Sequence, residues 1–252
     1  MIERDEFLNE LSQLTEKFQI IKNTKKISYY NVPAGFDIET SSFYEDDIKI
    51  PENKRCIMYH WQFGIFNLVT YGRTWQEFQS FILKVRDVMM LSNELRLVVY
   101  VHNLPYEFYF MHKRFAWDKV FFLDEKKPVY AITKFGVEFR CSLKLSGGRS
   151  LAQVGKELTK YKTEKMEGDL DYSLIRTPLT QLTDKEKKYC ENDIRVIESY
   201  IQEKIESDGD ITKIPLTNTG YVRNYCRKAC FNNWQKYHRF HTRTYNRYKV
   251  RV

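Results

Sequence analysis

The apolar run Leu-Val-Val-Tyr-Val at residues 97–101 constrains the fold of this chain more than any other segment. Every position in it is apolar, which is typical of a short strand that is buried on both faces. Pro105, shortly afterwards, favours the start of a helix. Runs of this length fall far short of the roughly 20 apolar residues that span a membrane. We therefore predict a buried strand over residues 97–102 and no transmembrane helix.

Helical and strand patterns alternate around this central strand. The expected elements are an amphipathic helix over 3–22, a strand over 34–40, a hairpin over 55–72 that turns near Phe66-Asn67, a helix over 74–90, a hairpin over 129–143, a helix over 150–158 and a helix over 183–207. The last helix begins at Thr183, which forms a capping box with Glu186. This order predicts an α/β domain with a mixed central sheet flanked by helices.

The positive charge of the chain is concentrated at its C-terminal end. The formal net charge is +8, but residues 221–252 contain nine Lys and Arg and no Asp or Glu. Residues 1–220 then hold 32 basic and 33 acidic residues, a net charge of −1. A surface for an acidic partner such as nucleic acid is therefore expected of the C-terminal segment and not of the whole fold.

The cysteines do not form a pattern that indicates disulfides. Five are scattered along the chain, which favours a reducing, cytoplasmic setting, and the acidic N-terminus does not resemble a secretory signal. Four residues near the C-terminus have the side-chain types of a zinc site: Cys226, Cys230, His238 and His241. The gap of seven residues between the two pairs is shorter than the about 12–15 of the common finger. Two thiols on a helix face remain the alternative.

Two carboxylates occupy alternate positions in the Phe-Asp-Ile-Glu-Thr segment at residues 36–40. Strand residues two apart point to the same face, so Asp37 and Glu39 are expected side by side. Like charges this close repel one another unless a cation lies between them. Carboxylate oxygens suit Mg²⁺ or Mn²⁺. A solvated strand end is the alternative interpretation.

A polar cluster follows the central strand, at His102, Asn103, Tyr106 and Glu107. The carboxyl ends of strands in α/β sheets are frequent sites of function, although such a cluster also suits a helix cap.

A third motif is expected in the last helix, where Tyr189 and Asp193 are four residues apart and share a face. A tyrosine hydroxyl beside a carboxylate can position a water molecule for metal-assisted attack. An ordinary amphipathic helix is the alternative interpretation.

In this order, the three motifs resemble those of the proofreading 3′–5′ exonuclease domain of family B DNA polymerases, in the tyrosine-bearing branch of the DEDD superfamily. The protein-primed phage polymerases are the most similar group. Residues 139–145 resemble their Ser-Leu motif, and residues 168–172 resemble their Gly-Asp-x-Asp-Tyr segment. The resemblance covers about residues 34–200. It implies an RNase H-like exonuclease fold, divided into an N-terminal helix over 1–30, an exonuclease domain over 31–207 and a basic segment over 208–252 that begins a polymerase portion or linker.

The resemblance also implies roles for individual residues. Two Mg²⁺ or Mn²⁺ ions would be held by four acids, Asp37, Glu39, Glu107 and Asp193, and Tyr189 would orient the attacking water. The implied reaction releases nucleoside 5′-monophosphates from the 3′ end of single-stranded DNA. The positions that match the single-strand ligands of the family are Thr40, His102, Asn103, Tyr106, Ser142 and Leu143.

The chain departs from the family pattern at two positions. Glu107 stands where the fourth acid is usually Asp, and its extra methylene moves the carboxylate outward. Glu167 stands where a lysine is thought to assist catalysis, and Lys165 is a candidate substitute.

The motifs of a polymerase palm do not occur in the sequence, so we expect no polymerase activity from this chain. The implied partners are a primer 3′ end, a polymerase palm portion and a priming terminal protein, in the host cytoplasm if the chain is phage-encoded. Two alternatives remain open: a DEDD-type 3′–5′ exoribonuclease, and a non-catalytic module that binds single strands or primer ends.

Overall fold

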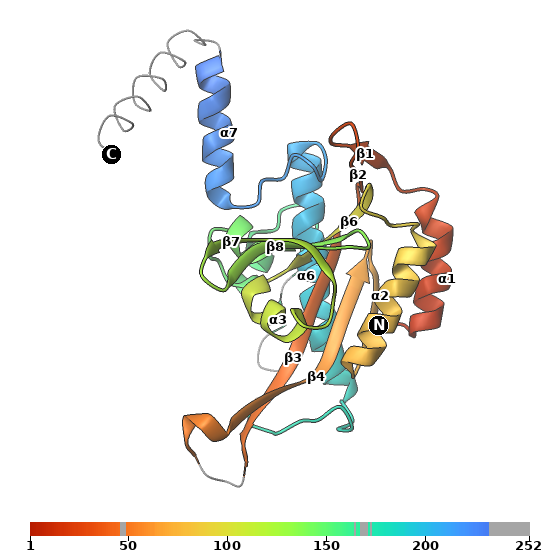
Figure 1. Cartoon of the computed structure of the whole chain (residues 1–252), viewed down its shortest axis with the longest axis vertical. Helices are drawn as coiled ribbons and strands as arrows, with labels where there is room; N and C mark the ends of the chain where they lie inside the picture. The colour runs from red at the N-terminus through yellow and green to blue at the C-terminus, as the bar shows by residue number, and fades with distance from the viewer. Residues whose placement is uncertain (46–48, 164, 167–170, 172, 232–252) are drawn as a thin grey trace, which may run out of the picture.

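The computed structural model describes residues 1–45, 49–163, 165–166, 171 and 173–231 (Figure 1). Nine strands of this part of the chain form one mixed sheet. Along its main path the order is β5 (Leu68–Gly72), β4 (Lys54–Ile65), β3 (Ala34–Tyr44), β6 (Leu95–Val101), β9 (Val137–Cys141), β8 (Lys127–Thr133) and β7 (Trp117–Asp124). The buried strand predicted over 97–102 is therefore β6, in the middle of the sheet.

The centre of the sheet is parallel and both edges are antiparallel. β3, β6 and β9 run in the same direction, and each of residues 97–101 is at most 1% exposed. β4 and β5 extend one edge as a meander, and β8 and β7 extend the other. The parallel centre places the carboxyl ends of β3, β6 and β9 at the same end of the sheet.

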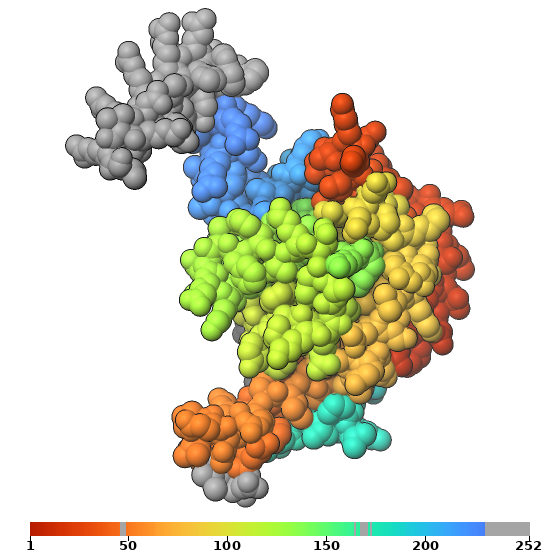
Figure 2. All heavy atoms as spheres, viewed as in Figure 1, coloured from red at the N-terminus to blue at the C-terminus, as the bar shows by residue number. Residues whose placement is uncertain are grey.

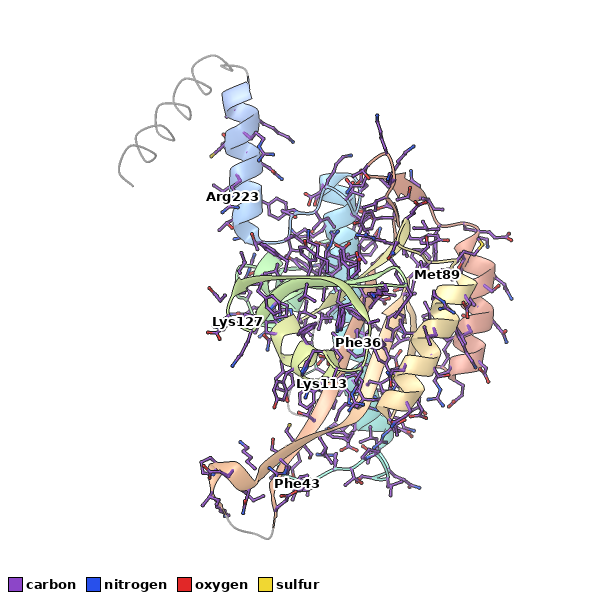
Figure 3. The ribbon with its side chains drawn as sticks, viewed as in Figure 1. Phe36, Phe43, Met89, Lys113, Lys127 and Arg223 are labelled. Atoms are coloured by element: carbon purple, nitrogen blue, oxygen red, sulfur yellow. The ribbon has the colours of Figure 1, made fainter. Side chains whose placement is uncertain are left out.

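Helices cover both faces of this sheet, as the order of elements predicts. On one face lie α1 (Arg4–Thr15), α2 (Trp75–Val88) and α3 (Leu104–Met111), and on the other α4 (Ser142–Leu145), α5 (Leu151–Glu157) and α6 (Asp184–Asp208). Figure 3 shows Phe36 in the interior of the molecule, where its ring stacks on Phe78 at 4.4 Å between centroids. The larger core therefore lies between the sheet and α1–α3.

Glycines allow α6 to lie unusually close to the sheet. A Cβ added at Gly64 would lie 2.4 Å from Cγ2 of Ile194, and one added at Gly35 would lie 3.2 Å from Cγ2 of Ile197. Both distances are shorter than ordinary van der Waals contacts, so a larger residue at Gly64 would force α6 outward. The same helix begins at the predicted capping box of Thr183 and Glu186, which fixes its N-terminal end.

The helix expected over residues 3–22 is wrong beyond Thr15. Residues 20–22 form β1 (Ile20–Lys22), which pairs antiparallel with β2 (Ser28–Tyr30), and β2 pairs in parallel with β6. The helical spacing of apolar residues continues past Thr15. Residues 20–22 nevertheless form a strand, because pairing with the tyrosine-rich β2 stabilises them more than a longer helix would. Likewise, the hairpin expected to reach residue 143 ends at Cys141, where α4 begins.

The last helix, α7 (Asn218–Phe231), extends away from the body of the molecule (Figure 1). It is anchored at its base, where Oη of Tyr221 donates to Oδ2 of Asp208 at 2.6 Å. Arg223 marks its exposed side in Figure 3. In the candidate zinc set, Cys226 is exposed, whereas the side chain of Cys230 and residues His238 and His241 lie outside the described part of the chain. Within the described residues, no helix has both the length and the apolar character needed to cross a bilayer.

Candidate metal centre

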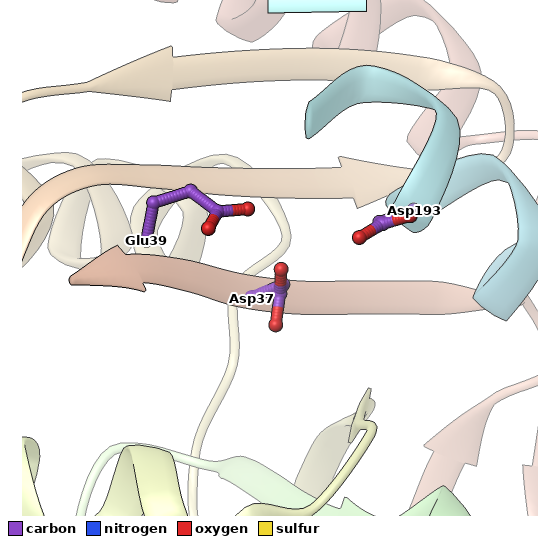
Figure 4. Close-up of side chains that lie close together, drawn as sticks. All are labelled: Asp37, Glu39 and Asp193. Atoms are coloured by element: carbon purple, nitrogen blue, oxygen red, sulfur yellow. The ribbon is translucent and has the colours of Figure 1, made fainter. Parts of the chain in front are cut away.

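Three of the predicted acids come together where α6 crosses β3. One carboxylate oxygen from each of Asp37, Glu39 and Asp193 lies within 4.8 Å of the other two. Figure 4 shows the two strand residues side by side on β3, with Asp193 approaching from α6. Glu39 and Asp193 are 6% and 4% exposed, and Asp37 is partly exposed. The arrangement confirms that the two carboxylates of β3 share a face.

The local sequence explains this arrangement. Phe36 and Ile38 point into the core between the sheet and α1–α3, so the intervening Asp37 must point toward α6. The missing side chain at Gly64 lets α6 approach β4 closely, which brings Asp193 over β3. Strand alternation and one close helix contact are therefore enough to assemble the cluster.

The acids of the cluster hold protons more strongly than ordinary carboxyl groups. Burial raises the pKa of Asp37 to about 7, with a further contribution from the charge of Asp193. Burial, and then the charges of Asp37 and Asp193, raise the pKa of Glu39 well above its usual range. Burial also raises the pKa of Asp193, although Lys165 acts in the opposite direction. When its carboxyl groups are ionised, the cluster therefore holds more negative charge than its surroundings compensate.

The contacts around the cluster hold its carboxylates in place. Nε2 of Gln62, on β4, donates to Oδ2 of Asp37 at 2.7 Å. Sγ of Cys190 donates to Oε1 of Glu39 at 3.9 Å, and Nζ of Lys165 lies 3.0 Å from Oδ2 of Asp193. Sequence reasoning missed Gln62 and Cys190. Gln62 faces Asp37 because β4 also pairs with β3, and the hairpin predicted over residues 55–72 did not include that second pairing.

The donor set fits a hard divalent cation. All three side chains offer oxygen, and Oδ1 of Asp193 is buried without a hydrogen-bond partner among the described residues. An unpartnered buried carboxylate oxygen is costly, and a metal ion would satisfy it. Oxygen donors at this density suit Mg²⁺ or Mn²⁺ better than zinc, which prefers nitrogen and sulfur. These residues could therefore hold such an ion.

Glu107 does not belong to the group of three. It lies in the first turn of α3 and is 3% exposed, with Oε2 unpartnered among the described residues. Burial, and then the charge of Asp37, raise its pKa well above the usual range. Its carboxyl group is thus close enough to the cluster to feel its charge, but outside the 4.8 Å group.

Tyr189 and Asp193 both lie against Lys165. Tyr189 is 6% exposed and one turn before Asp193 on α6. The ammonium group of Lys165 lies 5.2 Å from the centre of the Tyr189 ring. Glu167 lies outside the described residues, as do Gly168, Asp169, Leu170 and Tyr172 of the predicted Gly-Asp-x-Asp-Tyr segment.

Two of the predicted single-strand ligands meet at a hollow beside the cluster. The hydroxyls of Thr40 and Tyr106 form a hydrogen bond, and both residues line the hollow together with Ile38, Glu39 and Ser42. The bulge after Glu39 gives Thr40 a different pairing from the residues before it. Bulges of this kind re-aim side chains next to functional sites. The hollow therefore connects the predicted ligands directly to Glu39.

The remaining predicted ligands lie at the carboxyl ends of β6 and β9. These parallel neighbours place His102 beside Ser142, with 3.1 Å between Nδ1 and Oγ. Burial lowers the pKa of His102 to about 4, so its ring is neutral at pH 7. Asn103 is exposed in the left-handed backbone region, with φ of 86°, and Leu143 is partly buried against the core.

A buried arginine that sequence reasoning missed fixes the segment before α6 next to β3. The backbone nitrogen of Arg176 donates to Oγ of Ser41 at 2.9 Å, and Nη2 donates to Oε1 of Glu186 at 2.6 Å. Arg176 is 4% exposed. It therefore ties the outer half of β3 to the N-terminal end of α6, the two elements that carry the cluster.

No family model and no curated protein matches this chain. Among solved structures, it is similar to phi29 DNA polymerase complexed with primer-template DNA and incoming nucleotide substrates. The TM-score is 0.53 and the sequence identity 18%, over 70% of this chain. The match covers 31% of the polymerase chain, so this chain spans about a third of that protein. At this identity the likeness shows the fold, and with the mixed sheet it supports the predicted RNase H-like fold.

Proposed function

We propose that the chain is a metal-dependent 3′–5′ exonuclease that removes nucleoside 5′-monophosphates from the 3′ ends of single-stranded DNA. The observation that carries the proposal is the approach of Asp37, Glu39 and Asp193 to within 4.8 Å. Carboxylates this close repel one another when ionised, and a cation between them offsets that repulsion. The adjoining hollow leaves room for a strand end at Glu39.

The proposed ligands of two ions are Asp37, Glu39 and Asp193, with Glu107 completing the set. When bound, such ions would lower the pKa of a water molecule and offset the charge on the scissile phosphate and the leaving oxygen. The chain itself keeps the carboxylates aligned, since Gln62 holds Asp37 by a hydrogen bond. Glu107 lies farther out, so we expect it to contribute less than the other three.

Tyr189 is the residue that we propose to orient the attacking water. It shares a helix face with Asp193, and its ring contacts the ammonium group of Lys165. Lys165 also contacts Asp193, at 3.0 Å. We therefore propose that Lys165 takes the role that the family resemblance gives to a lysine at position 167.

The proposed substrate contacts lie on both sides of the hollow. The hydroxyls of Thr40 and Tyr106 face it, and the ring of Tyr106 offers a stacking surface for a terminal base. His102 and Ser142 would contact the sugar-phosphate backbone, together with Asn103 and Leu143. The fold neighbour is a polymerase whose structure contains primer-template DNA, which supports DNA over RNA.

We propose that the activity is the proofreading part of a phage-type DNA polymerase. The exonuclease unit would cover residues 31–207, with residues 208–252 leading toward a palm portion. The fold neighbour is itself a DNA polymerase, and the match covers 31% of its chain, which supports this placement. A palm portion and a priming terminal protein are the proposed protein partners.

The experiment is a degradation assay with a 5′-labelled single-stranded oligonucleotide, with Mg²⁺ or Mn²⁺ present. We expect a ladder of products shortened from the 3′ end, release of nucleoside 5′-monophosphates, and no reaction in EDTA or with Asp37→Ala/Glu39→Ala. The matched control is Asp5→Ala/Glu6→Ala, which removes two exposed acids from α1 and should retain full activity. Full activity of the double variant at positions 37 and 39 would contradict the proposal.

The same assay separates the alternatives. A matched RNA oligonucleotide degraded faster than DNA would identify an exoribonuclease. Tight binding of the strand with no product at any Mg²⁺ or Mn²⁺ concentration would identify a non-catalytic binding module.

A further inference from the structure

A second groove lies beside α3, outside the hollow at the candidate metal centre. It is lined by Pro105, Phe108, Tyr109 and His112 from the α3 region and by Phe122 and Lys126 from the β7–β8 hairpin. Tyr109 is 72% exposed and Phe122 is 44% exposed, although both are large rings. The reaction proposed above uses none of these side chains, so their exposure calls for another explanation.

Aromatic rings connect this groove to the hollow. Tyr106, which lines the hollow, lies 5.4 Å from Phe110, and Phe110 lies 5.5 Å from Tyr109, measured between ring centres. Within the groove, Phe108 lies 6.2 Å from Phe122 of the hairpin. Figure 2 shows α3 and the β7–β8 hairpin, coloured yellow-green, as one surface next to the orange strands β3 and β4. The ring of His112 joins the two sets, at 6.3 Å from Tyr109 and 6.2 Å from Phe108, so ring contacts run from the hollow to the hairpin.

The charge around the groove favours an anionic occupant. Residues 112–127 contain five Lys and Arg and three Asp and Glu, and Lys126 itself lines the groove. Figure 3 shows Lys113 and Lys127 on this side of the molecule, at the end of α3 and on the hairpin. Exposed rings interleaved with basic side chains are the features by which proteins bind single-stranded nucleic acid without reading its sequence.

We propose that the groove between α3 and the β7–β8 hairpin is an outer subsite for single-stranded DNA. It binds bases upstream of the 3′ end, by stacking on Tyr109 and Phe122, while the terminal nucleotide lies in the hollow at Tyr106. This inference rests on the proposed function, because it requires the 3′ end to lie at the metal centre. Its consequence is that strands long enough to reach the groove bind more tightly than those that fill the hollow alone.

The test measures binding of labelled oligothymidylates to the full chain in EDTA, where the strand stays intact, by fluorescence anisotropy. A dodecanucleotide reaches both sites, and a trinucleotide competitor reaches the hollow alone. We expect Tyr109→Ala/Phe122→Ala to weaken binding of the dodecanucleotide by about tenfold or more, because stacking on one ring contributes about 1–3 kcal/mol per base. Binding of the trinucleotide should not change. The matched control is Leu83→Ala, another partly exposed apolar side chain, on α2.

Unchanged binding of the dodecanucleotide by the double variant would overturn the subsite, and so would an equal loss for both lengths. Because hydrolysis is not needed for this readout, the subsite and the exonuclease fail separately. Length-dependent binding that requires Tyr109 and Phe122, with no nucleotide release in Mg²⁺ or Mn²⁺, would support the groove and contradict the enzyme. Nucleotide release by a chain whose binding does not depend on Tyr109 and Phe122 would support the enzyme and contradict the groove.

Discussion

A single buried carboxylate on the sheet and the cluster of three beside it are in opposite electrostatic states. Glu138, on β9, is 4% exposed and accepts hydrogen bonds from Arg140 at 2.7 Å and Tyr29 at 2.9 Å, with Arg96 at 3.5 Å. Burial acts to raise its pKa, but these partners, Arg140 above all, outweigh burial and lower the pKa. In the cluster on β3, the pKa values of all the acids are raised instead.

The difference lies in where the counter-charge comes from. Glu138 has its counter-charge within the chain and is complete without any addition. The cluster of Asp37, Glu39 and Asp193 contacts one cation among the described residues, Lys165, and leaves an oxygen of Asp193 unpartnered. The cluster could therefore hold a cation from solution, which would supply the missing positive charge.

The largest expected effect comes from removing the counter-charge of Glu138. Arg140→Met leaves that carboxylate buried without its main partner, which should lower the free energy of unfolding by about 3–5 kcal/mol. Lys165→Met, a similar change at the cluster, should cost far less, because the carboxyl groups there already hold protons more strongly than ordinary ones. Urea unfolding at pH 7 measures both. A loss at Arg140 no larger than the loss at Lys165 would remove the distinction between the two groups.

A smaller effect is expected from moving the helix that completes the cluster. Gly64→Ala places a Cβ 2.4 Å from Ile194, and the strain should cost about 1–3 kcal/mol of stability. Because α6 must shift, Asp193 moves away from β3 and affinity for Mn²⁺ should fall. Gly35→Ala is the control, since its added Cβ meets α6 only at 3.2 Å. Titrating Mn²⁺ into both variants compares their affinities for the ion. Equal affinities would show that the position of α6 does not determine Mn²⁺ binding.

A third effect is expected in how the stability of the metal-free protein depends on pH. The pKa of Asp37 is raised from 3.8 to about 7 in the folded chain, so between these values the folded state holds a proton that the unfolded chain releases. Its contribution to stability is therefore present at low pH and is lost as the pH rises toward 7. Glu138, with its lowered pKa, changes stability in the opposite direction, because its contribution is lost as the pH falls.

The measurement is the melting temperature in EDTA from pH 5 to pH 8, for the wild type and for Asp37→Asn. We expect the difference between the two to change across this range in favour of the variant, as the wild-type carboxyl loses its proton. A constant difference would show that Asp37 is already ionised at pH 5, with an ordinary pKa.

The sequence alone was sufficient to predict features that depend on local rules. Strand alternation places Asp37 and Glu39 on one face, and the capping box at Thr183 fixes the start of α6. The strand pair β1–β2 was not predictable, because Ile20 and Ile21 fit a helical spacing and a strand equally well, and only pairing with residues 28–30 decides.

The partners of the cluster depend on packing between distant segments. Gln62 faces Asp37 in the register by which β4 pairs with the first half of β3. The register changes at the bulge after Glu39. The position of Glu107 outside the group of three depends on how α3 sits at the end of β6, which no spacing rule determines. Arg176, buried between β3 and α6, resembles any exposed loop arginine in the sequence.

The most direct test of the account is calorimetric titration of Mn²⁺ into the metal-free protein. Three proteins are compared: the wild type, Asp37→Asn/Glu39→Gln, and the control Asp5→Asn/Glu6→Gln, which removes the same charge from the exposed side of α1. We predict that the wild type and the control bind Mn²⁺ alike, and that the variant at positions 37 and 39 loses this binding. Binding of Mn²⁺ by that variant with the affinity and stoichiometry of the wild type would contradict a metal centre between β3 and α6.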